Sequence, residues 1–325
     1  MAEARIVFHL PPRHLADWAE TRHLVLFRRI AEVLGPRGAK IVQRDRTLGP
    51  FRHGPTDAYD DGDLHIIDSG RAKGPGVLNA SIAYLPPFWH LSPHGVLAES
   101  GIGDLPYVQE EIPSERARAF IERMRLRYVV PRRSRRVQVQ QVARLPEGAI
   151  AVFLQGRQPY ENGLAYMEPI DMLAAVAAGS EGRPVLVKPH PLSLESDAEV
   201  IARVRAMGLA VTPTSANVHD IIGASVAIVS FNSACALEGF LHRKPAILFG
   251  ASDFHVFAET VRQPGEFPAA LARARARPGG GYARFLYWYF VQNCLNISAR
   301  DFEARLLDIF AAHGFPPERL GLTTE

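Results

Sequence analysis

The chain has 325 residues, of which 47% are hydrophobic and 22% charged, and its formal net charge is +3. This is the composition of a soluble globular protein with room for two domains of ordinary size. It excludes a disulfide framework, because Cys235 and Cys294 are the only cysteines and are typical of core residues in a reducing compartment. No apolar run reaches the roughly 18 residues of a membrane span and no secretory signal is present, so we expect a cytoplasmic protein.

The first half of the chain begins with a strand–helix–strand pattern. Residues 5–10 predict a strand, residues 17–34 a helix that a Gly-Pro pair ends, and residues 39–43 a second strand. A further strand is predicted over residues 64–68. This alternation is typical of a parallel sheet with helical crossovers.

Residues 77–103 combine aromatic and titratable side chains with prolines and glycines. We expect an irregular connection that shapes a pocket, because long loops inside compact domains are usually functional. The alternative is an aromatic-pinned connection between two layers of the fold. Its titratable residues His94 and Glu99 are candidate general bases.

Basic residues are concentrated over residues 115–136, where nine arginines stand against two glutamates. A helix is predicted over residues 114–127, with Ser114 as its N-cap, followed by an exposed linker. One interpretation is attraction to an anionic membrane surface or a polyanionic substrate, and the alternative is a solvated helix face. Nucleic-acid recognition motifs are missing here, so we expect no nucleic-acid partner.

The second half alternates strands and helices, which is the pattern of a doubly wound α/β domain. The predicted strands are residues 149–156, 184–189, 209–211, 226–230 and 245–250, and the predicted helices are residues 169–178, 196–207, 218–223 and 232–241.

The last part of the chain is predicted to be helical, with the aromatic run 285–290 in the core and a final helix over residues 298–312. We therefore expect an N-terminal α/β lobe over residues 1–145, a second α/β lobe over residues 146–275, and a helical segment over residues 276–325. The terminal helices are expected to pack back across the junction of the lobes.

The first motif with chemical potential is Lys188-Pro189-His190-Pro191, where the strand 184–189 ends. The two prolines stiffen the turn, so His190 is held where it can donate to a phosphate oxygen, and Lys188 adds positive charge. The alternative is a structural His-Pro corner whose imidazole satisfies a backbone group.

The second motif follows the strand 226–230, where Ser230, Asn232 and Ser233 precede a helix. Unpaired N–H groups at a helix N-terminus suit an anion, although simple capping by Asn and Ser is the alternative. Glu238, one turn into the helix, can accept a hydrogen bond from a ribose hydroxyl or orient the serines. Because the carboxyl ends of parallel strands gather ligand-binding groups, the two motifs together predict an anion site.

Competing motifs are missing from the sequence. It contains no G-x-S-x-G nucleophile elbow, no P-loop, no H-E-x-x-H and no cysteine pairs with metal spacing. We therefore expect neither a hydrolase triad nor a metal site.

The spacing of KPHP and the later S-x-N-S-x-x-x-x-E-G-x-x-x-R-K-P-x-x-x-x-G resembles bacterial capsule-polysaccharide glycosyltransferases over roughly residues 150–255. It is similar to the Kdo-transferring capsule enzymes and, more distantly, to the bacterial sialyltransferases. The resemblance implies a GT-B-like α/β fold with two Rossmann-like lobes, and a CMP-activated acidic sugar as co-substrate without a further cofactor. It also implies phosphate-binding turns at His190-Pro191 and at Ser230 and Ser233, with Glu238 as the following acidic position.

A possible base motif is Tyr59-Asp60-Asp61-Gly62, which is similar to the acidic-acidic-glycine motif of the sialyltransferases. The resemblance makes Asp61 a candidate general base beside His94 and Glu99. In that family the motif follows a strand, whereas here it precedes one, and Asp-Gly is also an ordinary turn.

The expected function is metal-independent, inverting transfer of a Kdo- or sialic-acid-type sugar to a glycan or glycolipid acceptor in bacterial surface-polysaccharide synthesis. His190 would stabilise charge on the leaving phosphate, together with Lys188 and the serine turn. The alternatives are a UDP-sugar or CDP-alcohol donor, or a non-catalytic nucleotide- or polysaccharide-binding protein of the capsule machinery. Residues 116–136 are the candidate contact with the cytoplasmic face of the inner membrane.

Overall fold

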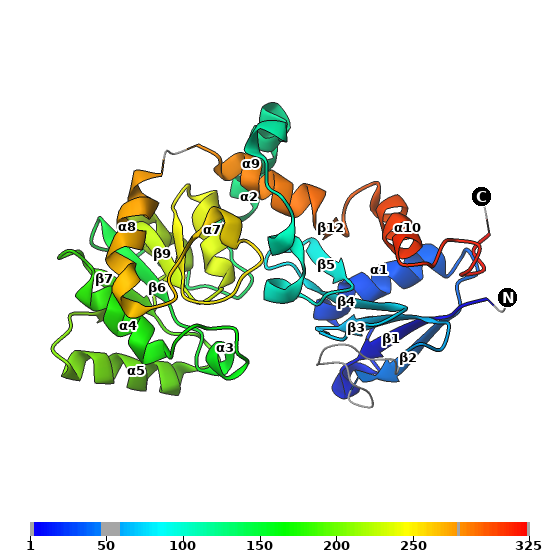
Figure 1. Ribbon diagram of the computed structural model, residues 1–325, viewed down its shortest axis with the longest axis horizontal. Coiled ribbons are helices and arrows are strands. Elements are labelled where there is room, and N and C mark those ends of the chain that lie inside the picture. The colour runs from blue at the N-terminus through cyan, green and yellow to red at the C-terminus, as the bar shows by residue number, and fades with distance from the viewer. Residues whose placement is uncertain (1–2, 47–58, 278–279, 324–325) are drawn as a thin grey trace. The chain divides into compact units, whose positions relative to one another are not determined.

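The computed structural model describes residues 3–46, 59–277 and 280–323. The chain divides into two compact units (Figure 1). Unit 1 comprises Met1–Leu105 and Phe290–Glu325, and unit 2 comprises Pro106–Tyr289. The chain therefore leaves unit 1 once and returns to it near its C-terminal end.

This division differs from the boundary expected at residue 145. Residues 106–145 belong to unit 2 because the helix α2 (Ser114–Tyr128) packs there: Phe120 contacts Tyr287, and Arg125 donates to the carbonyl of Leu241. The segment expected over residues 276–325 is itself divided, with its first part in unit 2 and its last part in unit 1.

Unit 1 is built on a six-stranded sheet of order β12-β5-β4-β3-β1-β2. The strands β1 to β4 pair in parallel, and β5 pairs in antiparallel fashion with both of its neighbours, β4 and β12. Their bounds are β1 Ile6–Leu10, β2 Ile41–Asp45, β3 Leu64–Asp68, β4 Val77–Ile82, β5 Phe88–Ser92 and β12 Leu295–Asn296.

The α-helices α1 (Val25–Leu34) and α10 (Phe302–Ala312) belong to unit 1 and share one apolar core with the sheet. The helix expected over residues 17–34 begins late, because the Thr21 hydroxyl bonds the carbonyl of Asp17 in a turn and a 3-10 turn precedes Val25. The 3-10 turns of this unit are Pro12–His14, Arg22–Leu24, Leu97–Glu99 and Ile102–Asp104.

The irregular connection expected over residues 77–103 is wrong for residues 77–82 and 88–92. The strands β4 and β5 form an antiparallel pair there, joined through a turn that contains the cis Pro86–Pro87 bond. The β-branched and aromatic residues of this stretch favour strands, and Trp89 and Leu91 bury their side chains in the core. Only the part after Ser92 stays irregular apart from short 3-10 turns.

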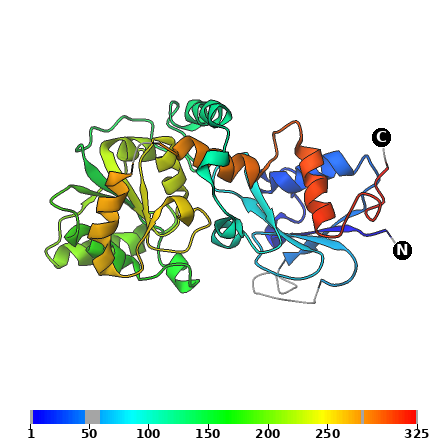
Figure 2. The same ribbon diagram turned by 45° about the horizontal axis from the view of Figure 1, so that its top comes forward.

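Unit 2 contains a six-stranded parallel sheet of order β11-β10-β9-β6-β7-β8. Alternate residues of β6 enter two different core clusters, since Ile150 and Val152 lie in one, and Ala149 and Ala151 in the other. Both faces of the sheet are therefore covered, as Figure 2 shows. The bounds are β6 Ala149–Phe153, β7 Val185–Lys188, β8 Thr212–Pro213, β9 Ser225–Ser230, β10 Ala246–Leu248 and β11 Glu259–Thr260.

The helices of unit 2 agree with the predicted alternation, although Ser114 is the first residue of α2 rather than its cap. The aromatic run 285–290 is buried, as expected, and the Tyr289 hydroxyl donates to Asp253. Beyond α2 the described α-helices of unit 2 are α3 Gln158–Glu161, α4 Pro169–Ala178, α5 Leu194–Ala206, α6 Val218–Ala224, α7 Ala234–Leu241, α8 Phe267–Ala276 and α9 Tyr282–Tyr287. Its described 3-10 turns are Gln109–Glu111, His255–Phe257 and Pro264–Glu266. A π-helical stretch, Trp288–Gln292, crosses the boundary between the two units.

Within the described ranges, no helix combines the length and the apolar character that a membrane crossing requires.

Candidate functional site

The two predicted turns lie at the same edge of the unit 2 sheet. Lys188 ends β7 and Ser230 ends β9, and both strands pair in parallel with β6, which lies between them. The residues that follow β6, Gln155 and Gly156, therefore stand between the two turns. They were not among the residues singled out from the sequence, and both make contacts that shape the turns.

Gln155 shapes the turn after β9. Its side-chain oxygen accepts hydrogen bonds from the backbone N–H groups of Phe231 and Asn232, both at 3.1 Å, and its amide nitrogen donates to Asn232 Oδ1 at 3.0 Å. The Asn232 amide nitrogen donates to the carbonyl of Ala251 at 3.0 Å. Asn232 thus stabilises the turn itself.

The two serines of this turn accept hydrogen bonds from the backbone. Ser230 Oγ accepts from the N–H of Ser233 at 3.2 Å, and Ser233 Oγ accepts from the N–H of Cys235 at 3.2 Å as the N-cap of α7. Ser233 therefore does cap the helix, as the alternative interpretation held. A hydroxyl that accepts keeps its own O–H to donate, so capping leaves the partly exposed Ser233 able to bind an anion, whereas Ser230 is fully buried.

Asp197, a fully buried residue of α5, fixes the turn after β7. Its carboxylate accepts from the N–H of His190 at 2.7 Å and from the N–H of Gly156 at 3.1 Å. Burial raises the pKa of Asp197, and the two N–H groups offset part of that effect. One carboxylate thus holds the turns after β6 and β7 together.

His190 is half-buried at this turn, and its contacts define its tautomer. The N–H of Leu192 donates to His190 Nδ1 at 3.3 Å, so in the neutral ring the proton is on Nε2. Burial lowers the pKa of His190, and the nearby charge of Arg136 lowers it further. Near neutral pH the side chain is therefore a neutral Nε2–H donor, followed by the exposed Pro191.

Lys188 makes internal hydrogen bonds that the sequence did not indicate. Its ammonium group donates to the carbonyls of Ser215 at 3.2 Å and Ala216 at 2.7 Å, and burial lowers its pKa. An ammonium has three N–H donors, so one remains for a ligand. Lys188 therefore holds the loop before α6 in place and keeps one N–H for a ligand.

Glu238 is fully buried in α7. Neither carboxylate oxygen has a hydrogen-bond partner within the described part of the chain, although Ser134 and Cys235 lie close by. Burial raises the pKa of Glu238 to about 7, and Ser134 and Cys235 offset only part of that. A buried carboxyl group without partners is costly, and a hydroxyl donor from a ligand would relieve it.

In unit 1, Asp61 lies at the end of a hydrogen-bonded chain with two histidines, near the amino end of β3. His65 Nε2 lies 2.9 Å from Asp61 Oδ1, and His65 Nδ1 lies 2.9 Å from the buried His9 Nε2. Burial raises the pKa of Asp61, but the bonds from His65 and from the N–H of Asp63 outweigh it, so the net shift is downward. A lowered pKa makes Asp61 a weak base, although its predicted role stays untested.

The other two candidate bases lie in the segment after β5. Glu99 forms an ion pair with Arg71 at 2.6 Å. His94 donates its backbone N–H to Ser92 Oγ at 3.1 Å, and its ring packs against Gly101. The catalytic roles of Glu99 and His94 stay predictions.

Asp68 was not among the candidates from the sequence. It ends β3 at the carboxyl edge of the parallel strands. It is 5% exposed, and Arg46 Nη1 donates to Asp68 Oδ2 at 2.6 Å. Burial raises the pKa of Asp68 to about 6, because it outweighs the opposing charge of Arg46. The signal that could have found it is the acidic residue directly after an apolar strand, LHIID.

Among the residues that the structure describes, no cluster of three or more His, Cys, Asp or Glu side chains is arranged to hold a metal ion.

Neither a protein-family model nor a curated protein matches the sequence. Among solved structures, the fold is similar to that of "Thermosulfurimonas dismutans KpsC, beta Kdo 2,7 transferase", with a TM-score of 0.56 and 13% identity over 95% of this chain and 99% of that one. A second KpsC structure from the same organism, "beta Kdo 2,4 transferase", matches with a TM-score of 0.46 and 14% identity over 88% of this chain and 90% of that one. The wall teichoic acid polymerase TagF matches with a TM-score of 0.32 and 8% identity over 95% and 88%.

The first of these likenesses covers nearly the whole of both chains and concerns the fold. It confirms, at the level of the fold, the resemblance to Kdo-transferring capsule enzymes. The predicted α/β, GT-B-like class is likewise confirmed, since each unit is an α/β unit built on a parallel-rich sheet.

Proposed function

We propose that the chain is a glycosyltransferase of bacterial surface-polysaccharide synthesis that uses a CMP-activated acidic sugar. The observation that carries the proposal is the pair of turns at one edge of the unit 2 sheet, where the Nε2–H of His190 and the hydroxyl of the partly exposed Ser233 are available to a phosphate, with the buried Ser230 beneath them. The fold likeness to a protein described as a Kdo transferase supports it.

In the proposed reaction the bond between the anomeric carbon and the phosphate oxygen breaks, and its electron pair stays on the phosphate, which leaves as CMP. His190 and the serine turn donate hydrogen bonds to that phosphate as its charge grows, which lowers the barrier electrostatically. Glu238 accepts a hydrogen bond from a ribose hydroxyl of the nucleotide, which would satisfy its buried carboxyl group.

The acceptor hydroxyl must lose a proton as its oxygen bonds to the anomeric carbon. We propose Asp68 as the base, because a pKa of about 6 leaves it ionised at neutral pH yet basic enough to take a proton. With Asp68 as base the transfer inverts the anomeric centre, whereas attack by Asp68 on that carbon, followed by displacement of Asp68 by the acceptor hydroxyl, gives net retention. The anomeric configuration of the product, read by NMR, decides between the two.

An acceptor carried on a lipid would bring the chain to a membrane surface, and α2 offers a surface of the right chemistry. Arg123, Leu126 and Arg127 follow a spacing that places them along one face of α2, Val130 follows two residues beyond its end, and all four are exposed. Cationic and apolar side chains on one face suit anionic lipid headgroups. Arg125 and Arg132 are not part of this face, since both make internal contacts.

The test is a donor panel of CMP-Kdo, CMP-sialic acid and UDP-sugars, scored by thermal shift and by nucleotide release with glycan acceptors. We expect stabilisation by CMP and release of CMP from one CMP-sugar. Stabilisation by UDP but not by CMP would overturn the donor assignment. Nucleotide binding without release in the presence of acceptors would indicate a non-catalytic binding protein instead.

A further inference from the structure

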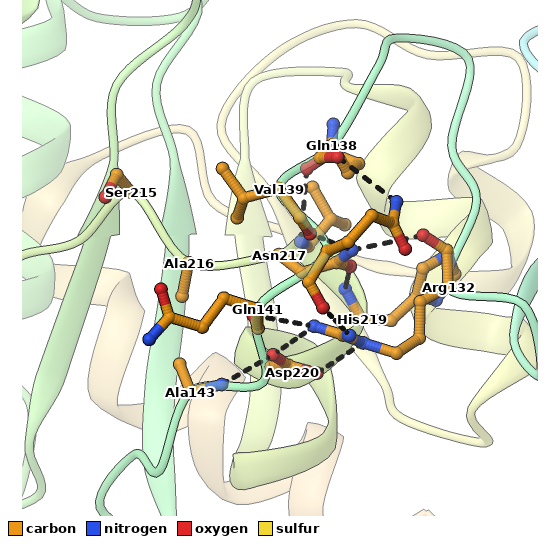
Figure 3. A network of polar contacts seen from close by, with 12 residues as sticks. Arg132, Gln138, Val139, Gln141, Ala143, Ser215, Ala216, Asn217, His219 and Asp220 are labelled. Carbon is orange, nitrogen blue, oxygen red and sulfur yellow. Dashed lines mark hydrogen bonds and ion pairs between the residues drawn. The ribbon is translucent and has the colours of Figure 1, made fainter.

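Residues 132–143, here called the strap, lie against the amino end of α6 and are fastened there by a dense polar network (Figure 3). Arg132 Nε and Nη2 donate to the two carboxylate oxygens of Asp220, at 2.9 and 2.6 Å. Both side chains are mostly buried, with 20% and 12% exposure. A bidentate, shielded pair of this kind fixes geometry far better than a surface ion pair does.

The same arginine closes the strap upon itself. Arg132 Nη1 donates to the carbonyl of Gln140 at 2.7 Å, and Nη2 donates to that of Gln141 at 3.2 Å. Ala143 returns a bond from its N–H to Asp220 Oδ2 at 3.0 Å. The segment expected to be an exposed linker is therefore a closed loop with a defined path.

Residues at the start of α6 hold the middle of the strap. The fully buried Asn217 donates from Nδ2 to the carbonyls of Arg132 at 3.1 Å and Val139 at 2.9 Å. The N–H of Val218 donates to Gln138 Oε1 at 3.3 Å. His219 Nε2 lies 2.6 Å from the carbonyl of Arg133, to which it donates. Few of these groups could move without leaving buried polar atoms unpaired.

The strap and the phosphate site share one support. The residues just before Asn217, Ser215 and Ala216, provide the carbonyls that hold the Lys188 ammonium group. Ser134 of the strap lies close to Glu238. Arg136 lies close enough to His190 for its positive charge to lower the pKa of that imidazole. The strap therefore borders both turns.

We propose that the strap forms a third side of the phosphate site, with Arg136 binding the donor phosphate and with Arg132 and Asp220 as positioning residues. The proposal rests on the proposed function and names a residue that adds a bidentate donor to the site. Lys188 donates two of its three N–H groups to carbonyls, so it keeps one N–H for a phosphate. Arg136 is exposed, and within the described residues no carboxylate pairs with it.

The chemistry of guanidinium suits this role. Its planar fork of donors matches two phosphate oxygens and stays charged at any physiological pH. Because Ser134 lies only two positions away, one rigid loop would set both the phosphate contact and the surroundings of Glu238.

The experiment compares binding of CMP with binding of cytidine by calorimetry, in the full chain. Arg136→Ala should weaken CMP binding by about ten- to a hundredfold, the usual effect of losing a hydrogen bond to a charged group. It should leave cytidine binding unchanged, because cytidine has no phosphate. Arg144→Ala, an exposed arginine just beyond the strap, is the matched control and should alter neither.

Positioning by Arg132 needs a readout that a general loss of stability does not move, and the imidazole pKa of His190, followed by NMR, provides it. Arg136→Ala should raise that pKa by removing a positive charge, and Arg132→Ala should raise it by displacing Arg136. Arg132→Lys should not restore it, because an ammonium cannot reproduce the bidentate pair. If Arg132→Ala unfolds, Asp220→Asn tests the same pair.

The outcomes separate the two claims. If the wild-type chain binds neither CMP nor UMP, the proposed function fails. If it binds CMP and Arg136→Ala binds CMP equally tightly, the function stands and the role of Arg136 is overturned. An unchanged His190 pKa in both Arg132→Ala and Asp220→Asn, with Arg136→Ala raising it, would overturn the positioning role alone.

Discussion

The backbone N–H of His190 donates a hydrogen bond of 2.7 Å to the carboxylate of Asp197, a residue with no solvent exposure. The same carboxylate accepts from the N–H of Gly156, so one buried acid fixes two of the turns that border the proposed phosphate site. The position of the histidine is thus set from beneath by α5 as well as by the two prolines beside it.

Removing this acid should loosen the turn. We expect Asp197→Ala to reduce the free energy of unfolding by about 1–3 kcal/mol, because two buried N–H groups lose their acceptor. It should also raise the KM for the donor. Urea unfolding and donor titration measure the two effects. Glu199→Ala, an exposed change on the same helix, is the control, and equal effects of both variants would contradict the role of Asp197.

His190→Ala should lower kcat by about a hundred- to a thousandfold, the usual effect of losing one donor to a developing charge. The melting temperature should hardly change, since the ring is half-buried and accepts only the N–H of Leu192. Steady-state release of CMP measures the rate. His255→Ala, an exposed histidine in the same unit, should stay active, and an active His190→Ala would sink the assignment.

The sequence predicted the strand–turn–helix framework of unit 2 well, because that framework depends on local signals. Apolar runs, prolines and capping residues indicate where each strand stops and each helix starts, and the parallel sheet then brings the turns after β7 and β9 to one edge. The positions of Ser230, Ser233 and His190 at or just after the ends of strands were predicted in this way.

What the sequence could not show are contacts between residues far apart in the chain. Gln155 supports a turn 77 positions later, and Arg132 pairs with a carboxylate 88 positions away. Nothing in the local pattern of either residue predicts its partner. The apolar stretch before Ser92 was misread for another reason: its prolines and glycines suggested a loop, while burial of alternate side chains favoured a strand pair.

Glu238 should make stability depend on pH. Its pKa of about 7 in the folded chain lies above the value of 4.5 expected when unfolded, so the folded state binds more protons between these values and stability falls as pH rises. Glu238→Gln removes this slope. Without ligand, the free energy of unfolding of the variant relative to that of the wild type should rise by on the order of 3 kcal/mol from pH 5 to pH 8. Urea midpoints that run parallel for the two proteins would contradict this.

Asp68→Asn should nearly abolish transfer while leaving CMP binding intact, because the amide cannot take the acceptor proton and Asp68 is not among the groups proposed to bind CMP. In the wild type, kcat/KM should fall as pH drops through about 6, where Asp68 becomes protonated. Asp61→Asn is the informative comparison, since its residue was the base candidate from the sequence. Loss of activity in Asp61→Asn with Asp68→Asn active would reverse the assignment.

The exposed face of α2 should bind anionic membranes. Leu126 in α2 and Val130 just after it are 67% and 68% exposed, and Arg123 and Arg127 lie on the same face of α2 as Leu126, so apolar insertion and charge attraction act together. We expect the chain to co-sediment with vesicles that contain phosphatidylglycerol and not with pure phosphatidylcholine. Added salt should weaken the binding, because it screens the arginines.

The apolar part of this contact separates membrane docking from simple charge attraction. Leu126→Glu combined with Val130→Glu should abolish co-sedimentation, since each change removes an inserting side chain and adds a repelled charge. Met207→Glu, at a 58% exposed position beside the end of α5, adds the same kind of charge elsewhere and should leave binding largely unchanged. Equal losses in both proteins would show that net charge alone governs the interaction, and the helix face would then have no role.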